Sequence, residues 1–186
     1  MVKRTTFSQH ITALKKEVQM LLRFYLALKR IVKFDNFHEI SRSYYVDLLV
    51  ACKAIENDIL IRITKFNDTD KGVHSFHALV NEMSLSHPNY QSIIDKVTKF
   101  ATLLRPFELT RRHTELAHLK IGEQDNELMV QYDFRIMIVL IAEIVDLAAQ
   151  TKLPYLWSDG RYEKFDLRKE ILESEERLSR PLGDFM

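Results

Sequence analysis

The chain has 186 residues, of which 46% are hydrophobic and 28% charged, and this balance is typical of a globular domain and not of a disordered chain. Because 27 basic residues stand against 26 acidic ones, the net charge of +1 gives no bulk attraction to nucleic acid or to an anionic membrane. Only four glycines and four prolines are present, so tight turns are few. This composition predicts an all-α, antiparallel helical bundle of about five to seven helices and disfavours a β-sandwich or barrel.

A cytoplasmic location is expected from three features of the chain. The single cysteine, Cys52, cannot form an intramolecular disulfide, which fits a reducing compartment. The first residues, Met1 to Thr6, lack the apolar core of a signal peptide. The most hydrophobic run, Ile136 to Ala142, is too short and too closely flanked by charges to span a membrane.

Two long helices are predicted at the start of the chain. The first covers about residues 7 to 33, with Thr6 and Gln9 as a capping box. Its apolar stripe could mark a coiled-coil dimer, but the breadth of the stripe favours the core of a bundle. The second covers about residues 38 to 65, with Asn36 and Glu39 as its capping pair, and should pack antiparallel to the first. Both stripes repeat at spacings of three and four, through Phe7, Ile11, Leu14, Val18, Leu21, Tyr25, Leu28 and Val32 and through Tyr45, Leu48, Cys52, Ile55, Ile59, Ile63 and Phe66.

The aromatic residues of these helices, Phe24-Tyr25 and Ser43-Tyr44-Tyr45, fall on apolar faces and are interpreted as core residues. A short helix is then expected over residues 73 to 83. The next helix is expected to begin at Pro88 and to run to about residue 104, where Arg105-Pro106 should interrupt or kink the chain.

A separate helix is predicted from Thr110 to about Lys120, with Gly122 as its stop, followed by a polar loop. Asp133 is the expected N-cap of a strongly apolar helix through Ala149. We therefore divide the chain into a helical bundle over 1–153 and a loop with a charged C-terminal helix over 154–186. In that last part, Leu167, Ile171 and Leu178 form a thin apolar stripe that could lie on the bundle or on a second subunit.

Two arginines and two histidines gather within eight residues, at Arg111, Arg112, His113 and His118. An arginine can hold a phosphate and a histidine can move a proton, so the cluster could cleave RNA without a metal. On an ideal helix, Arg111 lies on the same face as His118, whereas Arg112 lies about 120° away. The same residues could instead be a solvated helix face with ordinary ion pairs to Glu115 and Glu108.

The run Arg112-His113-Thr114-Glu115-Leu116-Ala117-His118 is similar to the motif of the HEPN superfamily (higher eukaryotes and prokaryotes nucleotide-binding). That motif has an arginine, a polar residue after it, and a histidine four to six residues further on. The Ala117-His118 pair resembles the form seen in the HEPN-like abortive-infection family of the U type. The layout around the motif is also similar over roughly residues 10 to 150, including the segment from Ile63 to Asp68 at the end of the second helix.

The resemblance implies a homodimer whose two motifs face one cleft, and a metal-independent endoribonuclease that needs no cofactor. His118 would be the acid/base group and Arg112 the phosphate clamp. His113 would orient the phosphate or protonate the leaving group, and Arg111 would reinforce the clamp. The resemblance also implies RNA as a partner, a possible antitoxin or other partner protein, no membrane, and a role in phage defence or as a toxin.

Other kinds of site are less well supported by the sequence. His74 and His77 are three residues apart on a predicted helix, but no third ligand completes a metal site, so we interpret them as polar surface residues. No glycine-rich phosphate loop is present. Two alternatives to a ribonuclease stay open: a HEPN-like module that binds RNA or protein without catalysis, and a helical scaffold protein.

Overall fold

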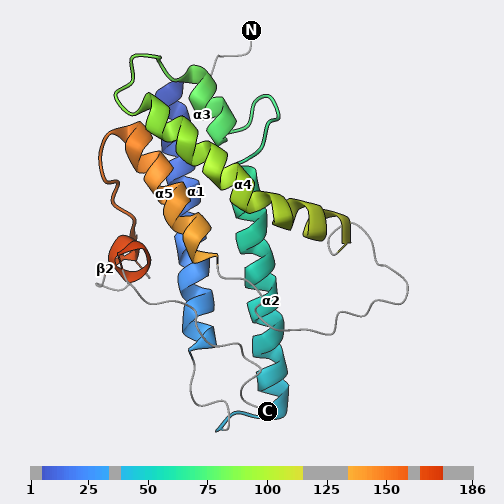
Figure 1. Cartoon of the computed structure of the whole chain (residues 1–186). Helices are drawn as coiled ribbons and strands as arrows, with labels where there is room; N and C mark the ends of the chain where they lie inside the picture. Colours follow the sequence, from blue (N-terminus) through green and yellow to red (C-terminus); the bar gives the residue numbers. More distant parts are fainter. Residues whose placement is uncertain (1–5, 34–38, 115–133, 159–163, 174–186) are drawn as a thin grey trace.

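The computed structural model describes residues 6–33, 39–114, 134–158 and 164–173. These residues form five α-helices, a two-stranded β-hairpin and one short π-helical segment, so the predicted all-α bundle is confirmed (Figure 1). In chain order the elements are α1 (Phe7–Val32), α2 (Arg42–Lys65), α3 (Phe76–Glu82), α4 (Tyr90–Thr114), α5 (Arg135–Ala149), β1 (Leu156–Ser158), β2 (Lys164–Asp166) and η2 (Arg168–Leu172).

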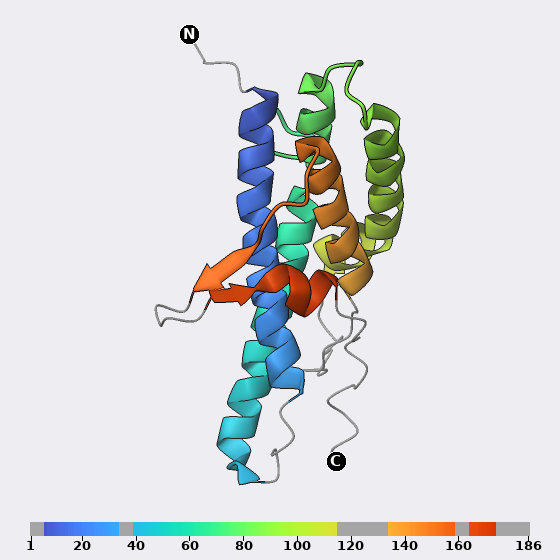
Figure 2. The same cartoon turned by 90° about the vertical axis from the view of Figure 1, so that its left-hand side faces the viewer.

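The long antiparallel pair α1 and α2 is the frame of the molecule (Figures 1 and 2). The capping box predicted at the start of α1 is present: the Thr6 amide donates to Gln9 Oε1 at 2.8 Å, and the Gln9 amide donates to Thr6 Oγ1 at 3.4 Å. The capping prediction for α2 was wrong, because the helix starts at Arg42 and its N-cap is Ser41, whose hydroxyl accepts from the Tyr44 amide.

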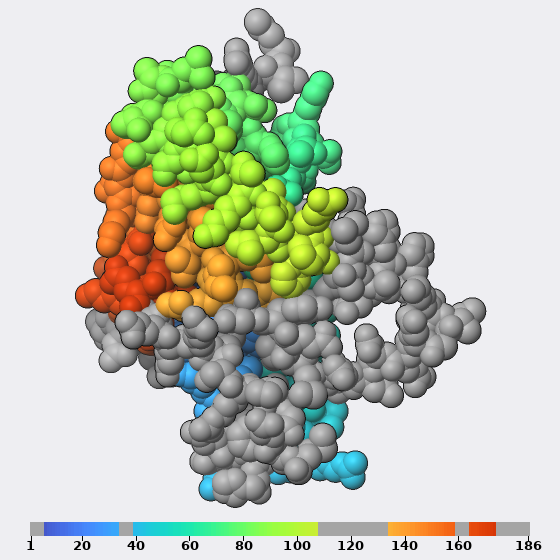
Figure 3. Space-filling view, viewed as in Figure 1, coloured from blue at the N-terminus to red at the C-terminus, as the bar shows by residue number. Residues whose placement is uncertain are grey.

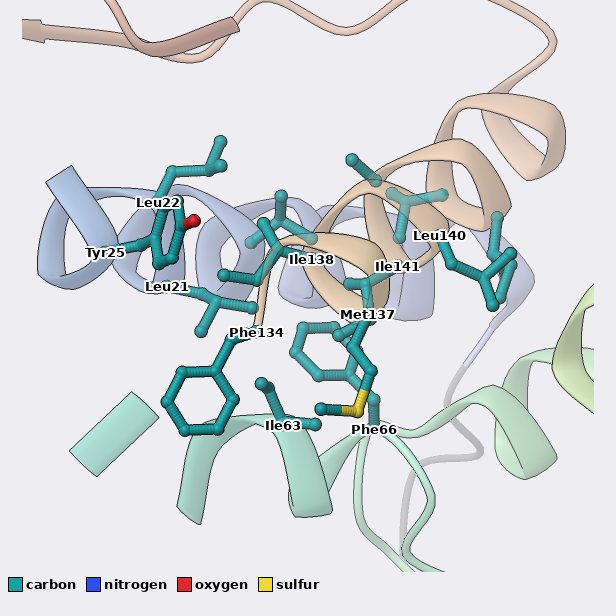
Figure 4. Packing of buried hydrophobic residues seen from close by; sticks show 14 of the residues in the cluster. Leu21, Leu22, Tyr25, Ile63, Phe66, Phe134, Met137, Ile138, Leu140 and Ile141 are labelled. Atoms are coloured by element: carbon teal, nitrogen blue, oxygen red, sulfur yellow. The ribbon is translucent and has the colours of Figure 1, made fainter. Parts of the chain in front are cut away.

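The core lies where α1, the C-terminal half of α2, and α5 meet. Figure 4 shows side chains from all three segments pointing toward one another, including fully buried Tyr25, Phe66 and Phe134. Burial of each large apolar side chain of this kind contributes about 1.5–3 kcal/mol to stability. The labelled residues are Leu21, Leu22, Tyr25, Ile63, Phe66, Phe134, Met137, Ile138, Leu140 and Ile141.

The short helix α3 and the helix α4 cover the remaining side of the core. Ser75 caps α3 by accepting from the Ala78 amide, and Phe76 stacks edge-on against Phe100 of α4 with ring centroids 5.4 Å apart. The helix predicted to begin at Pro88 instead begins at Tyr90. In the space-filling view, α4 and α5 lie side by side on one face of the molecule (Figure 3).

The N-terminal half of α2 differs from the prediction. Tyr44, expected in the core, is 53% exposed, and Tyr45 is only half-buried, whereas Tyr25 of α1 is buried as expected. Here α2 projects beyond α4 and α5 and has α1 as its neighbour (Figures 1 and 2). An apolar pattern identifies the side of a helix whose burial is favourable. It does not show whether another part of the chain packs on that side.

The C-terminal part forms a small hairpin where a loop and a helix were predicted. Strands β1 and β2 pair antiparallel, with Trp157 opposite Phe165, and η2 follows directly. The hairpin lies against α1, since Gln19 Nε2 donates to the Leu156 carbonyl at 2.6 Å and the guanidinium of Arg23 lies 5.6 Å from the Trp157 ring. Of the predicted apolar stripe, Leu167 and Ile171 are buried, and Leu178 lies outside the described residues.

Candidate functional site

The helix α4 carries the first part of the arginine–histidine cluster. It runs from Tyr90 to Thr114 with Pro106 inside it, so the prediction of a separate helix from Thr110 was wrong. Pro106 has no amide hydrogen to donate to the Thr102 carbonyl, and such a position bends a helix without having to end it. Figures 1 and 2 show α4 changing direction near this position. The bend that the sequence predicts at Arg105-Pro106 is therefore present.

Contacts on both sides of the bend hold α4 against α5. Before it, Lys96 Nζ lies 2.6 Å from Glu143 Oε2, and Leu104 is fully buried. After it, the rings of Phe107 and Phe134 have centroids 6.5 Å apart. Phe134 is fully buried at the start of α5. Phe107 and Phe134 are thus the two described core residues that flank the cluster in the sequence.

Arg111, Arg112 and His113 occupy consecutive positions of α4. At about 100° per residue, Arg111 comes one turn after Phe107 on the same side of the helix, because the two are four residues apart. Arg112 and His113, five and six residues after Phe107, occupy positions more than about 100° away from that side. Phe107 packs toward the core. The positions of Arg112 and His113 are thus on the sides of α4 that do not carry this core contact.

His118, the predicted acid/base group, lies outside the described residues, as do Glu115 and the Ala117-His118 pair. The structure therefore places three of the four predicted site residues on one helix and does not place the fourth. The predicted N-cap Asp133 of the following helix also lies outside the described residues. The position before α5 is taken by Phe134, which makes no side-chain cap.

A pairing of His10 with His74 that the sequence did not predict joins α1 to the segment before α3. His10 Nδ1 and His74 Nδ1 are 3.1 Å apart, and the rings meet edge-on with centroids 4.8 Å apart. His10 is only 5% exposed. Burial first, and then the neighbouring His74, lower the pKa of His10, while Glu82 acts in the opposite direction. The lowered pKa favours the neutral form of His10, and the tautomers of the two rings decide which nitrogen donates and which accepts.

His74 and His77, both predicted to be polar surface residues, are exposed and half-buried, respectively. His74 meets His10, whereas His77 Nε2 lies 3.3 Å from Asn67 Oδ1, so the two histidines turn to different partners. Among the described residues, no three His, Cys, Asp or Glu side chains lie close enough together to hold a metal ion.

A second polar cluster, Asp146 with Arg168, was missed because its members are 22 residues apart and belong to different elements. Arg168 Nη2 lies 2.9 and 2.8 Å from the two carboxylate oxygens of Asp146 and also donates to the Leu153 carbonyl. The guanidinium lies 5.1 Å from the centre of the Tyr155 ring. Burial above all, then Asp146, raises the pKa of Tyr155, against the influence of Arg168. This cluster connects η2 to α5, and its contacts indicate a structural role.

Cys52 gives no sign of a reactive thiol. It is fully buried in α2 beside Glu56, and burial, together with that carboxylate, raises the pKa of the thiol to about 11. A thiol with a raised pKa stays protonated and is a poor nucleophile. Of the polar groups described so far, only the Arg111–His113 stretch has the residue types of a phosphate-processing site.

No family model matches the chain. No curated protein and no solved structure matches it either. The similarity to the HEPN superfamily therefore rests on the motif and on the layout around it. In the part of the chain that the structure describes, no helix is long and apolar enough to cross a membrane.

Proposed function

We propose that the protein is a HEPN-type, metal-independent endoribonuclease that acts in phage defence or as a toxin. The observation that carries the proposal is the run from Arg112 to His118, with the residue types and the spacing of the superfamily motif. Its first three residues are in the last turn of α4, after Phe107, which packs toward the core.

The chemistry assigned to the motif needs only a base, an acid and a positive clamp. A neutral His118 takes the proton from a ribose 2′-hydroxyl, and the oxygen then attacks the adjacent phosphorus. The bond to the 5′-oxygen breaks, leaving a 2′,3′-cyclic phosphate on one fragment and a 5′-hydroxyl on the other once the leaving oxygen is protonated. Arg112 neutralises the charge that builds on the non-bridging oxygens.

The register of α4 favours Arg112 over Arg111 as the clamp. Arg111 follows Phe107 on the side of the helix that carries the contact with Phe134, whereas Arg112 lies on another side. His113, next to Arg112, is assigned to orient the phosphate or to protonate the leaving oxygen. Arg111 is assigned to reinforce the positive charge at the site.

A binding module without catalysis is the second candidate. It is favoured by the net charge of +1, which gives the chain no bulk attraction to an RNA substrate. In that case, changes at Arg112 would alter binding and there would be no cleavage to lose.

The deciding experiment incubates single-stranded RNA with the purified protein in EDTA and examines the cut ends. We expect fragments with 2′,3′-cyclic phosphate and 5′-hydroxyl ends, and a fall in rate of about 10²–10⁴-fold in His118→Ala and of similar order in Arg112→Ala. Arg105→Ala is the matched control, because Arg105 is an exposed arginine on the same helix before the bend. A folded wild type that leaves RNA intact, or an Arg105→Ala variant as slow as Arg112→Ala, would contradict the proposal.

A further inference from the structure

The solvent side of α2 carries an aligned row of exposed residues, Ser43, Val46, Val50, Ala54 and Ile61, which we name the outer face. The exposed fractions of the three large members are 43% for Val46, 52% for Val50 and 42% for Ile61. At 100° per residue all five positions fall within about 40° of the line through Val50. They are opposite the buried side of α2, which faces α1.

The N-terminal half of α2 has more apolar residues than its contact with α1 buries. Residues 44 to 52 read Tyr-Tyr-Val-Asp-Leu-Leu-Val-Ala-Cys and contain one charged residue, Asp47. Only Cys52 among them is buried. Single exposed apolar residues are normal on a protein surface, but a helix that is apolar on nearly all sides is usually covered on all sides. The outer face is therefore suited to contact with another chain.

The charges beside the outer face indicate what kind of chain binds to it. Arg42 and Lys53 lie roughly 60–80° to one side of the Val50 line, and Asp47 and Asp58 lie roughly 60–80° to the other. One edge is thus basic and the other acidic between residues 42 and 58. A surface with complementary edges about one apolar line fits a second copy of itself, as a two-fold interface requires.

The same edges fix the relative direction of the two helices. When two copies of α2 lie parallel about a two-fold axis, the basic edge of each meets the acidic edge of the other, as e and g positions do in a parallel coiled coil. Arg42 is then offset from the partner's Asp47 by five residues, or about 7.5 Å along the axis, and Lys53 has the same offset from the partner's Asp58. An antiparallel pair would bring each edge against its own kind.

Among the described residues, two of these four charged side chains form ion pairs within the chain and two do not. Lys53 Nζ lies 3.2 Å from Glu56 Oε2, and Asp58 Oδ2 lies 2.5 Å from Arg62 Nε. Arg42 and Asp47, in contrast, form no ion pair among the described residues. They are exposed and lie on opposite edges of α2, about 140° apart, so they cannot pair with each other within one helix.

We propose that the outer face of α2 is the interface through which two copies of this chain form a parallel, two-fold dimer. The interface covers residues 42 to 61, since Lys65 ends the acidic edge. This inference rests on the exposed face and its charges, and it holds whether or not the protein cleaves RNA.

The first test is sedimentation velocity of the full chain over a range of concentrations. We expect a dimer, and in Val50→Glu a rise in the dissociation constant of about 100-fold or more, because the change places a charge at the centre of the apolar face in both copies. Leu85→Glu is the control, since Leu85 is an exposed apolar residue in the turn between α3 and α4. A wild type that stays monomeric at all concentrations, as expected if the face serves a different partner, or a Val50→Glu variant that dimerises normally, overturns the proposal.

The second test examines the charge pairs across the interface and the relative direction of the two α2 helices. Arg42→Glu should weaken the dimer roughly 5-fold, and adding Asp47→Lys should restore it, because the exchanged charges meet across the interface. Ser43→Cys and Ile61→Cys should each form a disulfide with its own copy in a parallel dimer. If only a mixture of these two variants cross-links, the helices are antiparallel and the arrangement proposed here is wrong. Circular dichroism verifies that each variant is folded.

Discussion

At the scale of single residues, His10 links the fold to pH. Burial and His74 lower its pKa in the folded chain, so the unfolded chain binds a proton at His10 more readily than the folded chain does. As the pH falls below the ordinary histidine pKa of about 6.5, the unfolded state gains protons that the folded state does not, and the free energy of unfolding falls until the folded pKa is reached. Above that window, His10 has no effect on the pH dependence.

We therefore expect His10→Phe to flatten the loss of stability on acidification. One proton changes the free energy of unfolding by at most about 1.4 kcal/mol per pH unit, which bounds the difference in slope between wild type and variant. Urea unfolding between pH 8 and pH 5 measures this slope. His77→Gln is the matched control because His77 contacts Asn67 and not His10, and the slope of His10→Phe is compared with those of wild type and control. Equal slopes in His10→Phe and wild type would show that His10 is not the titrating group.

Residues that act locally could be predicted from the sequence, and those that act over a distance could not. The Thr6–Gln9 capping box follows from two residues three positions apart, and the structure contains it. The pairing of Asp146 with Arg168 depends on how the hairpin returns to α5, which no local pattern records. The exposure of Tyr44 was mispredicted for the same reason: its helical position is right, but the covering element is absent from the described residues.

At the scale of elements, the ion pair between Asp146 and Arg168 connects η2 to α5. The side chains of Asp146 and Arg168 are 15% and 14% exposed, so each would leave a mostly buried charge without its partner if the other were removed. We expect Asp146→Ala to lower the free energy of unfolding by about 2–3 kcal/mol, somewhat less than for a fully buried pair.

Urea unfolding of Asp146→Ala, Arg168→Ala and the double variant measures the coupling of this pair, and the double variant should lose less than the sum of the two. Lys152→Ala is the control because Lys152 is an exposed lysine whose Nζ lies 3.8 Å from Glu173 Oε1, and loss of such an exposed pair should cost little. Additive losses in the double variant would mean that the two side chains stabilise the fold independently.

Long helices were predictable because their apolar stripes repeat over many turns, and α1 and α2 match their predicted ranges closely. Strands of three residues, such as β1 and β2, are too short to show alternation. Pro106 was overestimated as a stop: a proline removes one hydrogen bond, and α4 continues with a bend because its packing on α5 resumes at Phe107. The motif of the candidate site could be recognised in the sequence. That its first three residues belong to α4 could be seen only in the structure.

At the scale of the whole molecule, the proposed ribonuclease site and the proposed dimer through α2 together raise the question of which chain supplies the arginine and which the histidine of each site. On an ideal helix Arg112 and His118 are about 120° apart, so one chain alone does not readily bring both to one phosphate. A parallel dimer through α2 places the α4 helices of the two copies at the same level along the two-fold axis. An equal level is the condition under which an arginine of one copy could serve the histidine of the other, and we propose that each site is shared in this way.

Mixing Arg112→Ala with His118→Ala tests this arrangement. Each variant alone should be inactive, but a mixed dimer has one site in which Arg112 comes from one chain and His118 from the other. With free exchange, half of the dimers are mixed and one of their two sites is intact, so we expect about a quarter of the wild-type rate. Adding Val50→Glu to both chains should abolish the recovery, because it prevents their association. If mixing restores nothing while the single variants still form dimers, each site is built from one chain, and Arg111, which shares a helix face with His118, becomes the better candidate for the clamp.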